Sequence, residues 1–194
     1  MRTELQFLIL ILVAAVVLIT VGLGVWLVTH KMRSQKLSEK FGPEYDYIVE
    51  KEGDRRTVEE ILQERVKRVT QLDLRTPDEN ERDRYHGEWI EVQASFVDDP
   101  SKSVTEANRL ITELMIARGF PVADFEQRAA DLSVMYPELV SNYRNAHAIA
   151  LKNQNGESST EDLRQAMVYY RSLFEKLLGI VEVQETEEKE LVTK

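Results

Sequence analysis

The chain has 194 residues, of which 34 are acidic and 25 are basic, so its net charge at neutral pH is −9. This balance argues against a nucleic-acid partner, because phosphates are bound by a basic face. The chain has no cysteine, which excludes disulfides, thiol catalysis and thiolate metal sites. The length that follows the first apolar segment predicts a single folded domain.

The first feature along the chain is an uncharged apolar stretch at residues 5–29. As an α-helix at about 1.5 Å per residue it would extend roughly 37 Å, more than the bilayer hydrocarbon of about 30 Å. We predict one transmembrane helix there, preceded by a short amino-terminal end at residues 1–4. A cleaved signal peptide would have a shorter apolar core and a small-residue cleavage site. A buried soluble helix that is apolar on all sides would need a larger protein to cover it.

The charges beside this stretch predict its orientation. Lys31, Arg33 and Lys36 follow it, whereas Arg2 precedes it. Since Lys and Arg near a span are retained in the cytoplasm, we expect the amino end outside and the soluble domain in the cytoplasm, in a single-pass protein of the cell membrane. Trp26 suits the membrane interface, because its ring is amphipathic. The predicted membrane-interface residues are Trp26, Lys31, Arg33 and Lys36.

Two helical segments are predicted between the span and the main domain. Residues 30–53 form a juxtamembrane segment with a short helix near 44–51, and residues 54–75 form a charged amphipathic helix. In the second, Glu64 and Arg68 are spaced for an i,i+4 ion pair. A stalk and a helix packed on the next domain both fit this pattern; we favour packing, because an exposed apolar stripe promotes association. That stripe is Val58, Leu62, Val66, Val69 and Leu72.

The main domain is predicted as a small helical bundle at residues 76–178, followed by an acidic tail at residues 179–194. Apolar residues recur through the bundle at spacings of three and four, and no stretch alternates with β-branched enrichment. The predicted fold class is therefore all-α. The expected helices lie at about 77–97, 104–119, 125–136, 137–151 and 160–178.

Proline and capping patterns support this division into helices. The first turn is the helical position that tolerates proline, and we expect helix starts near Pro43, Pro77, Pro100, Pro121 and Pro137. Capping boxes place a Ser or Thr three residues before a Glu. The predicted boxes are Thr57 with Glu60, Thr76 with Glu79, Ser103 with Glu106, and Ser158 with Glu161.

An aromatic stripe marks the first helix of the bundle. Tyr85, Trp89 and Phe96 recur at helical spacing, which predicts that they face the core. Trp89 is expected to pack there, and the alternative is a ligand platform or partner contact. We expect Gly87 to permit a close helix crossing there.

No motif for catalysis or cofactor binding is found. The glycines form no phosphate loop, dinucleotide fingerprint or nucleophile elbow. His30 is expected at the membrane edge, and His86 lies one turn after Asp83 without a third metal ligand. His147 is expected to be buried and hydrogen-bonded to a neighbour, in preference to a role as catalytic base. We therefore assign no catalytic residue, metal ligand or cofactor.

The position of three carboxylates at the start of the third bundle helix explains their presence. Asp124, Glu126 and Asp131 are placed in its first turns, where a helix amino end favours negative charge. Paired-carboxylate catalysis would need convergence across helices, which the sequence does not show.

Three segments carry a resemblance to a known group: FGPEYD at 41–46, DFEQRAADL at 124–132 and TEDLRQAM at 160–167. With these residues the chain resembles an uncharacterised group of bacterial proteins that have one amino-terminal membrane span and one helical domain. The resemblance covers nearly the whole chain. It implies a bacterial membrane protein, and it brings neither an assigned activity nor a functional residue.

Three functions fit these observations. The preferred one is a membrane-tethered helical module that acts in protein interaction or as a scaffold, with the lipid bilayer and a protein partner or a second copy as its contacts. Thr20 and Gly24 form a small-xxx-small pair that would serve self-association. The second is a membrane-anchored helical enzyme or ligand-binding domain with a pocket near Trp89 and His147. The third is an envelope protein with the same domain outside the cytoplasm.

Overall fold

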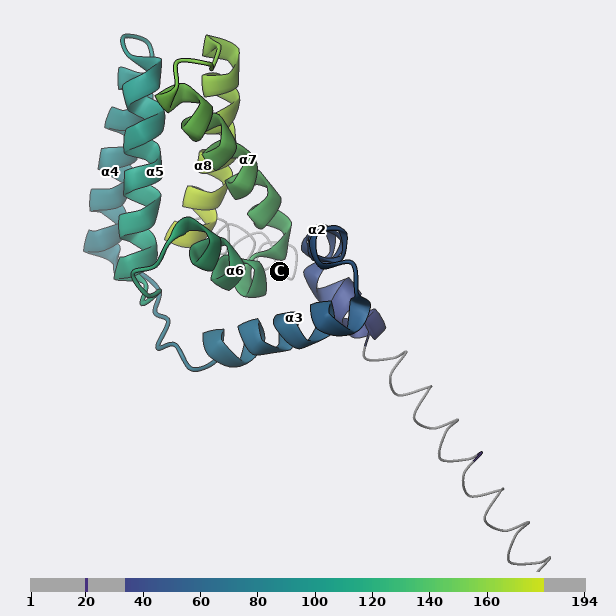
Figure 1. The fold of residues 1–194 in the computed structure, drawn as a ribbon. Coiled ribbons are helices and arrows are strands. Elements are labelled where there is room, and N and C mark those ends of the chain that lie inside the picture. The colour runs from purple at the N-terminus through teal and green to yellow at the C-terminus, as the bar shows by residue number, and fades with distance from the viewer. Residues whose placement is uncertain (1–19, 21–33, 180–194) are drawn as a thin grey trace, which may run out of the picture.

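The computed structural model describes residue 20 and residues 34–179. Within these residues every regular element is an α-helix and no strand occurs, which confirms the all-α prediction (Figure 1). Residues 34–41 are helical. The helices that follow them are α2 (Pro43–Glu52), α3 (Arg55–Val69), α4 (Glu79–Ser95), α5 (Pro100–Ala117), α6 (Phe125–Met135), α7 (Pro137–Gln154) and α8 (Thr160–Leu178).

The predicted transmembrane helix at residues 5–29 lies outside the described residues, apart from Thr20. The predicted acidic tail does so as well, beyond Gly179. Among the residues that the structure does describe, no helix has both the length and the apolar character needed to cross a bilayer.

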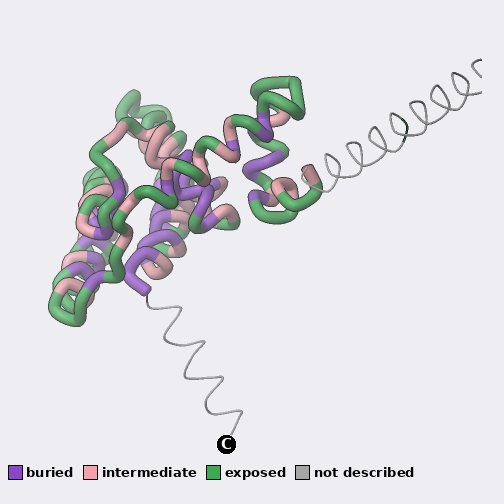
Figure 2. Tube along the Cα trace, turned by 90° about the horizontal axis from the view of Figure 1, so that it is seen from below, coloured by how far each residue is buried: buried purple, intermediate pink, exposed green. Residues whose placement is uncertain are grey.

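The bundle is formed by α4, α5, α7 and α8, with α6 across one end (Figure 1). α8 packs against α5 and α7, and α4 packs mainly on α5. Side chains from each helix meet in one apolar core, and Figure 2 shows the buried stretches alternating with exposed ones along the helices. Tyr85 and Trp89 are buried in this core, as the aromatic stripe predicts, and Phe96 packs at its edge.

A second, smaller apolar cluster lies beside the bundle. It is formed by residues 34–41, α2 and α3, and Phe41 and Leu62 are completely buried in it. We call residues 34–69 the N-terminal unit. α3 packs against α2 and α6, in agreement with the expectation that its apolar stripe is covered. Val134 of α6 is the buried apolar side chain that the bundle contributes to this cluster.

The helix starts agree with the prolines better than with the predicted capping boxes. Pro43, Pro100 and Pro137 lie in the first turns of α2, α5 and α7. The four predicted capping boxes are wrong, because other residues cap these helices. Most of the observed caps are aspartates, whose charge also interacts favourably with the helix dipole. In α4 and α8 a reciprocal box forms one or two residues later than predicted. The side chains that cap α3, α4, α5, α6 and α8 are Asp54, Asp78, Asp99, Asp124 and Ser159.

Arg118, at the end of α5, fixes the connection between α3 and α4 to the bundle. The backbone N–H of Arg75 in this connection donates to the Arg118 carbonyl at 2.9 Å. The Arg118 guanidinium donates to the carbonyl of Leu177 and the hydroxyl of Tyr136, both at 2.9 Å. Nε of Arg118 also donates to the carbonyl of Arg75 at 3.2 Å. One nearly buried side chain therefore ties the connection to the start of α7 and the end of α8.

Candidate functional site

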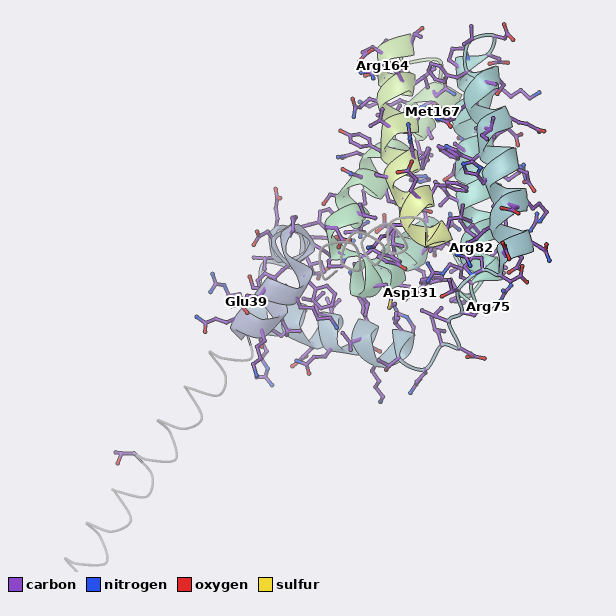
Figure 3. The ribbon with its side chains drawn as sticks, turned by 180° about the vertical axis from the view of Figure 1, so that it is seen from behind. Glu39, Arg75, Arg82, Asp131, Arg164 and Met167 are labelled. Atoms are coloured by element: carbon purple, nitrogen blue, oxygen red, sulfur yellow. The ribbon has the colours of Figure 1, made fainter. Side chains whose placement is uncertain are left out.

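The N-terminal unit and the bundle meet at a set of charged side chains, of which the two carboxylates are buried. Glu44 comes from α2, Arg65 and Arg68 from α3, Asp131 from α6 and Arg144 from α7. We call these residues the charge network. Figure 3 labels Asp131 in the region where α6 faces α3.

Glu44 is the centre of the charge network. Its side chain is 1% exposed, and Oε1 accepts hydrogen bonds from Arg65 at 2.7 Å and from Arg144 at 3.0 Å. Arg65 also donates to the hydroxyl of Ser133 at 3.2 Å. Glu44 lies in the first turn of α2, where the helix dipole favours a negative charge. The two guanidinium groups replace the water that this carboxylate loses on burial.

Asp131 forms the second contact. Its Oδ1 accepts hydrogen bonds from Arg68 at 2.8 and 2.7 Å and from the amide of Gln127 at 2.9 Å. Its Oδ2 is buried and has no hydrogen-bond partner among the described residues. An unsatisfied buried oxygen opposes the closed contact, because it has lost its water without a replacement.

Arg144 extends the charge network to the surface. It donates to the exposed carboxylate of Glu126 at 3.0 Å, and its guanidinium carbon lies 4.4 Å from the centre of the Tyr47 ring. Burial opposes the charge of Arg144, but the hydrogen bonds of Glu44 and Glu126, together with the charge of Glu44, outweigh it, so the pKa of Arg144 is raised above its usual value. Arg144 therefore remains a cation within the contact.

This arrangement is suited to holding two helical bodies together. Each carboxylate faces guanidinium groups, which do not lose their protons in proteins, so the charge network contains no acid–base pair for catalysis. Removal of one member would leave its partner charged and buried, whereas separation of the two bodies would return every charge to water. The charge network is therefore a polar contact between the N-terminal unit and the bundle, and we call this contact the joint.

Sequence reasoning missed this joint. Asp131 lies in the second turn of α6, so its predicted place at the amino end of the helix is wrong. Arg68 pairs with Asp131 and not with Glu64, so the predicted i,i+4 ion pair is wrong as well. Asp124 caps α6 and Glu126 lies in its first turn, as expected. A signal for Asp131 existed in its neighbours, since a carboxylate between small and apolar residues (AADLSV) is typical of a buried position.

One of the four predicted membrane-interface residues lies within the described part of the chain. Trp26, Lys31 and Arg33 lie outside the described residues. Lys36 lies exposed on the helix of residues 34–41, which also carries Glu39, labelled in Figure 3.

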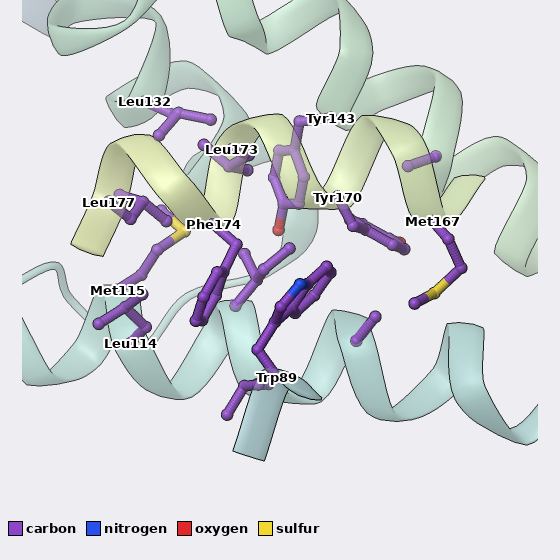
Figure 4. Close-up of a cluster of buried hydrophobic side chains, with 14 of the residues drawn as sticks. Trp89, Leu114, Met115, Leu132, Tyr143, Met167, Tyr170, Leu173, Phe174 and Leu177 are labelled. Atoms are coloured by element: carbon purple, nitrogen blue, oxygen red, sulfur yellow. The ribbon is translucent and has the colours of Figure 1, made fainter. Parts of the chain in front are cut away.

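Trp89 and His147 do not form one site. The Trp89 ring is 3% exposed and stacks on Phe174, with 4.6 Å between ring centres (Figure 4). The His147 ring stacks on Phe125 with 3.6 Å between ring centres, and its buried Nδ1 has no hydrogen-bond partner in the part of the chain that the structure describes. Trp89 is thus a core residue, as predicted, whereas the hydrogen bond expected for His147 is not found at this nitrogen.

His86 and Gly87 are both exposed on α4. Within residue 20 and residues 34–179, no group of three side chains is placed to hold a metal ion. A Cβ added to Gly87 would meet nothing within 4 Å. The expectation of a close helix crossing at Gly87 is therefore wrong.

An open groove of about 190 Å³ lies between α4 and α8. Phe96, Met167 and Val168 contribute apolar surface, and Arg164 and Arg171 lie at its margin; Figure 3 labels Arg164 and Met167. Each arginine is paired with a glutamate of α8, so the margin is close to neutral. Val168 is 47% exposed, and the groove has room for an apolar side chain of another protein.

Comparisons of the chain with protein-family models, curated proteins and solved structures gave no match. The function proposed below therefore depends on the residues and their geometry alone. The resemblance to a bacterial group stays a prediction.

Proposed function

We propose that the chain is a single-pass, membrane-tethered helical module that binds a protein partner at the bilayer surface. The observation that carries the proposal is the short distance in sequence between the apolar stretch and the folded body. Residues 30–33 separate the stretch at 5–29 from the helical residues 34–41, which end at the fully buried Phe41. Since a stretch of this length and composition partitions into a bilayer, the body would be held next to the lipid.

The groove between α4 and α8 supports the binding part of the proposal. It joins exposed apolar surface at Val168 to half-buried Phe96, next to polar margins. Apolar centres with polar rims are typical of protein contacts. The partner class that fits is a protein segment with a projecting apolar side chain.

Membrane insertion and sidedness are tested on the full chain. Carbonate washing of membranes is expected to leave the chain in the pellet; release into the supernatant would contradict the tether. Because the chain has no cysteine, Glu157→Cys in the exposed loop after α7 gives a single labelling site. A membrane-impermeant maleimide is expected to label it only after the cells are permeabilised. Labelling in intact cells would favour the extracytoplasmic alternative.

Partner binding is tested with two matched substitutions of exposed valines. Val168→Asp places a charge in the groove, whereas Val122→Asp places one on the connection between α5 and α6, where Val122 is 84% exposed. Proteins that copurify with the chain from detergent extracts are compared. We expect a partner to be lost with Val168→Asp and kept with Val122→Asp. Equal recovery with both variants would exclude the groove, and a monomer without a partner would count against the module.

A further inference from the structure

We propose that the charge network is a conformational joint, at which the N-terminal unit and the bundle separate while each stays folded. The proposal deepens the proposed function, because in a tethered chain this motion would change the position of the bundle relative to the bilayer. It rests on the proposed function for that consequence alone. The opening itself is a property of residues 34–179.

Most apolar side chains of the two bodies are buried in two separate clusters. Phe41 and Leu62 lie in the cluster of the N-terminal unit, and neither belongs to the core of the bundle. Among the described residues, Val134 is the buried apolar side chain that enters the smaller cluster from the bundle, and Leu72 and Leu74 pack partly against both. Separation therefore removes Val134 from the smaller cluster and uncovers part of Leu72 and Leu74, but it does not divide the core of the bundle.

The remaining contact between the two bodies is electrostatic. When it opens, hydration of the charges compensates for the attraction that is lost. The side chains of Arg65 and Arg144 are 14% and 13% exposed, and that of Glu44 is 1% exposed, so the closed form strips these charges of most of their water. On opening they regain that hydration, which offsets much of the lost attraction. Disruption of an apolar core has no comparable compensation. Opening at the charge network is therefore expected to cost less free energy than opening within either apolar core.

The pair of Arg68 and Asp131 is the weaker half of the joint. The Arg68 side chain is 36% exposed, so water reaches this pair in the closed form. The unpartnered Oδ2 of Asp131 gains a hydrogen bond from water when the contact opens. Opening is therefore expected to begin between α3 and α6.

The connection to α4 provides a hinge. α3 ends at Val69, and the N–H groups of Gln71 and Leu72 still bond back to the carbonyls of Arg68 and Val69. The first backbone hydrogen bond from this connection to the bundle is the one that the N–H of Arg75 donates to the carbonyl of Arg118. Thr70 and Gln71 follow α3 directly and are exposed. Dihedral changes at these positions can turn α3 without a change in the bundle, as is usual for hinges at the ends of elements.

The test measures distances between pairs of nitroxide labels by pulsed EPR, on the full chain in lipid nanodiscs at rising urea concentration. The absence of native cysteine permits each pair without further changes. Glu64→Cys in α3 with Lys152→Cys in α7 spans the joint. Glu91→Cys in α4 with Lys152→Cys lies within the bundle, and Glu50→Cys in α2 with Glu64→Cys lies within the N-terminal unit. All four positions are exposed.

We expect the pair across the joint to acquire a second, longer distance at urea concentrations where both other pairs keep their native distances. Glu44→Gln is expected to raise the ratio of open to closed chains by at least about 100-fold, because two guanidinium groups lose their buried carboxylate. Glu60→Gln is the matched control, since it removes an exposed ion pair with Arg56 in the same region of the chain. This variant is expected to leave the ratio unchanged.

The proposal is overturned if all three pairs lose their native distances together over one range of urea. The wild-type series decides this point even where the Glu44→Gln chain fails to fold. Insertion into the bilayer is not needed for the answer: a chain that carbonate washing releases still gives the three distances in solution. Failure of the tether and failure of the joint are therefore separate results.

Discussion

Gly119→Ala is expected to destabilise the bundle, because the backbone at this position requires a residue without a side chain. Gly119 has φ +100° and follows α5 in a Schellman ending. Its N–H donates to the carbonyl of Ile116 at 2.9 Å, and the N–H of Phe120 donates to that of Met115 at 3.0 Å. A Cβ at Gly119 would lie 2.5 Å from the backbone oxygen of Asp73.

Two costs add in this variant. A left-handed backbone conformation costs a residue with a Cβ about 1–2 kcal/mol. The contact with Asp73 adds an overpacking cost of about 1–3 kcal/mol. The contacted atom is a backbone oxygen, and it cannot move away easily because the hydrogen bonds between Arg75 and Arg118 hold this connection in place. The free energy of unfolding should therefore fall by roughly 2–5 kcal/mol, a large part of the total for an ordinary domain.

Gly87→Ala is the matched control, because Gly87 lies exposed inside α4 and a Cβ there meets nothing. It should raise the free energy of unfolding by about 0.5–1 kcal/mol, since alanine has the higher helix propensity. Both variants are unfolded in urea as full chains in detergent, and the fluorescence of Trp89 is followed in a Trp26→Phe background. Equal urea midpoints for Gly119→Ala and wild type would refute the reasoning.

Two further predictions concern the core and the surface. Trp89→Ala should lower the free energy of unfolding by about 3–5 kcal/mol, because it removes a ring buried against Phe174; urea unfolding followed by circular dichroism measures this, and an unchanged midpoint would contradict a core position. The hydrogen bonds from Arg75 lower the pKa of Glu81 to about 2. The ionised Glu81 therefore stabilises the native state above pH 4.5, and this contribution is lost as the pH falls toward 2. An NMR titration of the Glu81 carboxylate checks the value, and Glu81→Gln should remove this part of the acid dependence.

The helices were predictable because their signals are local. Apolar spacing together with one loop was enough to place α8 at Thr160–Leu178, as the structure has it. Pro100 and Pro137 marked the starts of α5 and α7 for the same reason, since a proline restricts its own backbone whatever surrounds it. The packing of Trp89 followed from the spacing of its neighbours on one helix face.

The joint was not predictable because its partners are distant in sequence. Glu44 and Arg144 are 100 positions apart, and their pairing depends on how α2 packs against α7. Arg68 had a carboxylate at i−4 in Glu64, but tertiary packing gave it the buried Asp131 instead. Local spacing identifies which charges are able to pair on one helix, and the packing of helices decides which of them do.

His147 gives a further test of packing, because the environment of its ring predicts the direction of a pH effect. Burial against Phe125 lowers the pKa of His147, and the nearby charge of Arg128 lowers it further. Below about pH 6.5 the unfolded chain therefore binds a proton that the native chain does not, so the free energy of unfolding decreases as the pH falls from there toward the native pKa.

Urea midpoints of wild type, His147→Gln and His86→Gln across this pH range measure the effect. His147→Gln loses the ring contact with Phe125 at every pH, so the slope below about pH 6.5 is the informative quantity and not the midpoint itself. That slope should become shallower in His147→Gln and should keep its wild-type value in His86→Gln, whose histidine is exposed on α4. Equal slopes in all three chains would mean that the His147 ring is as well solvated in the native state as in the unfolded one, and the stacked position on Phe125 would then be wrong.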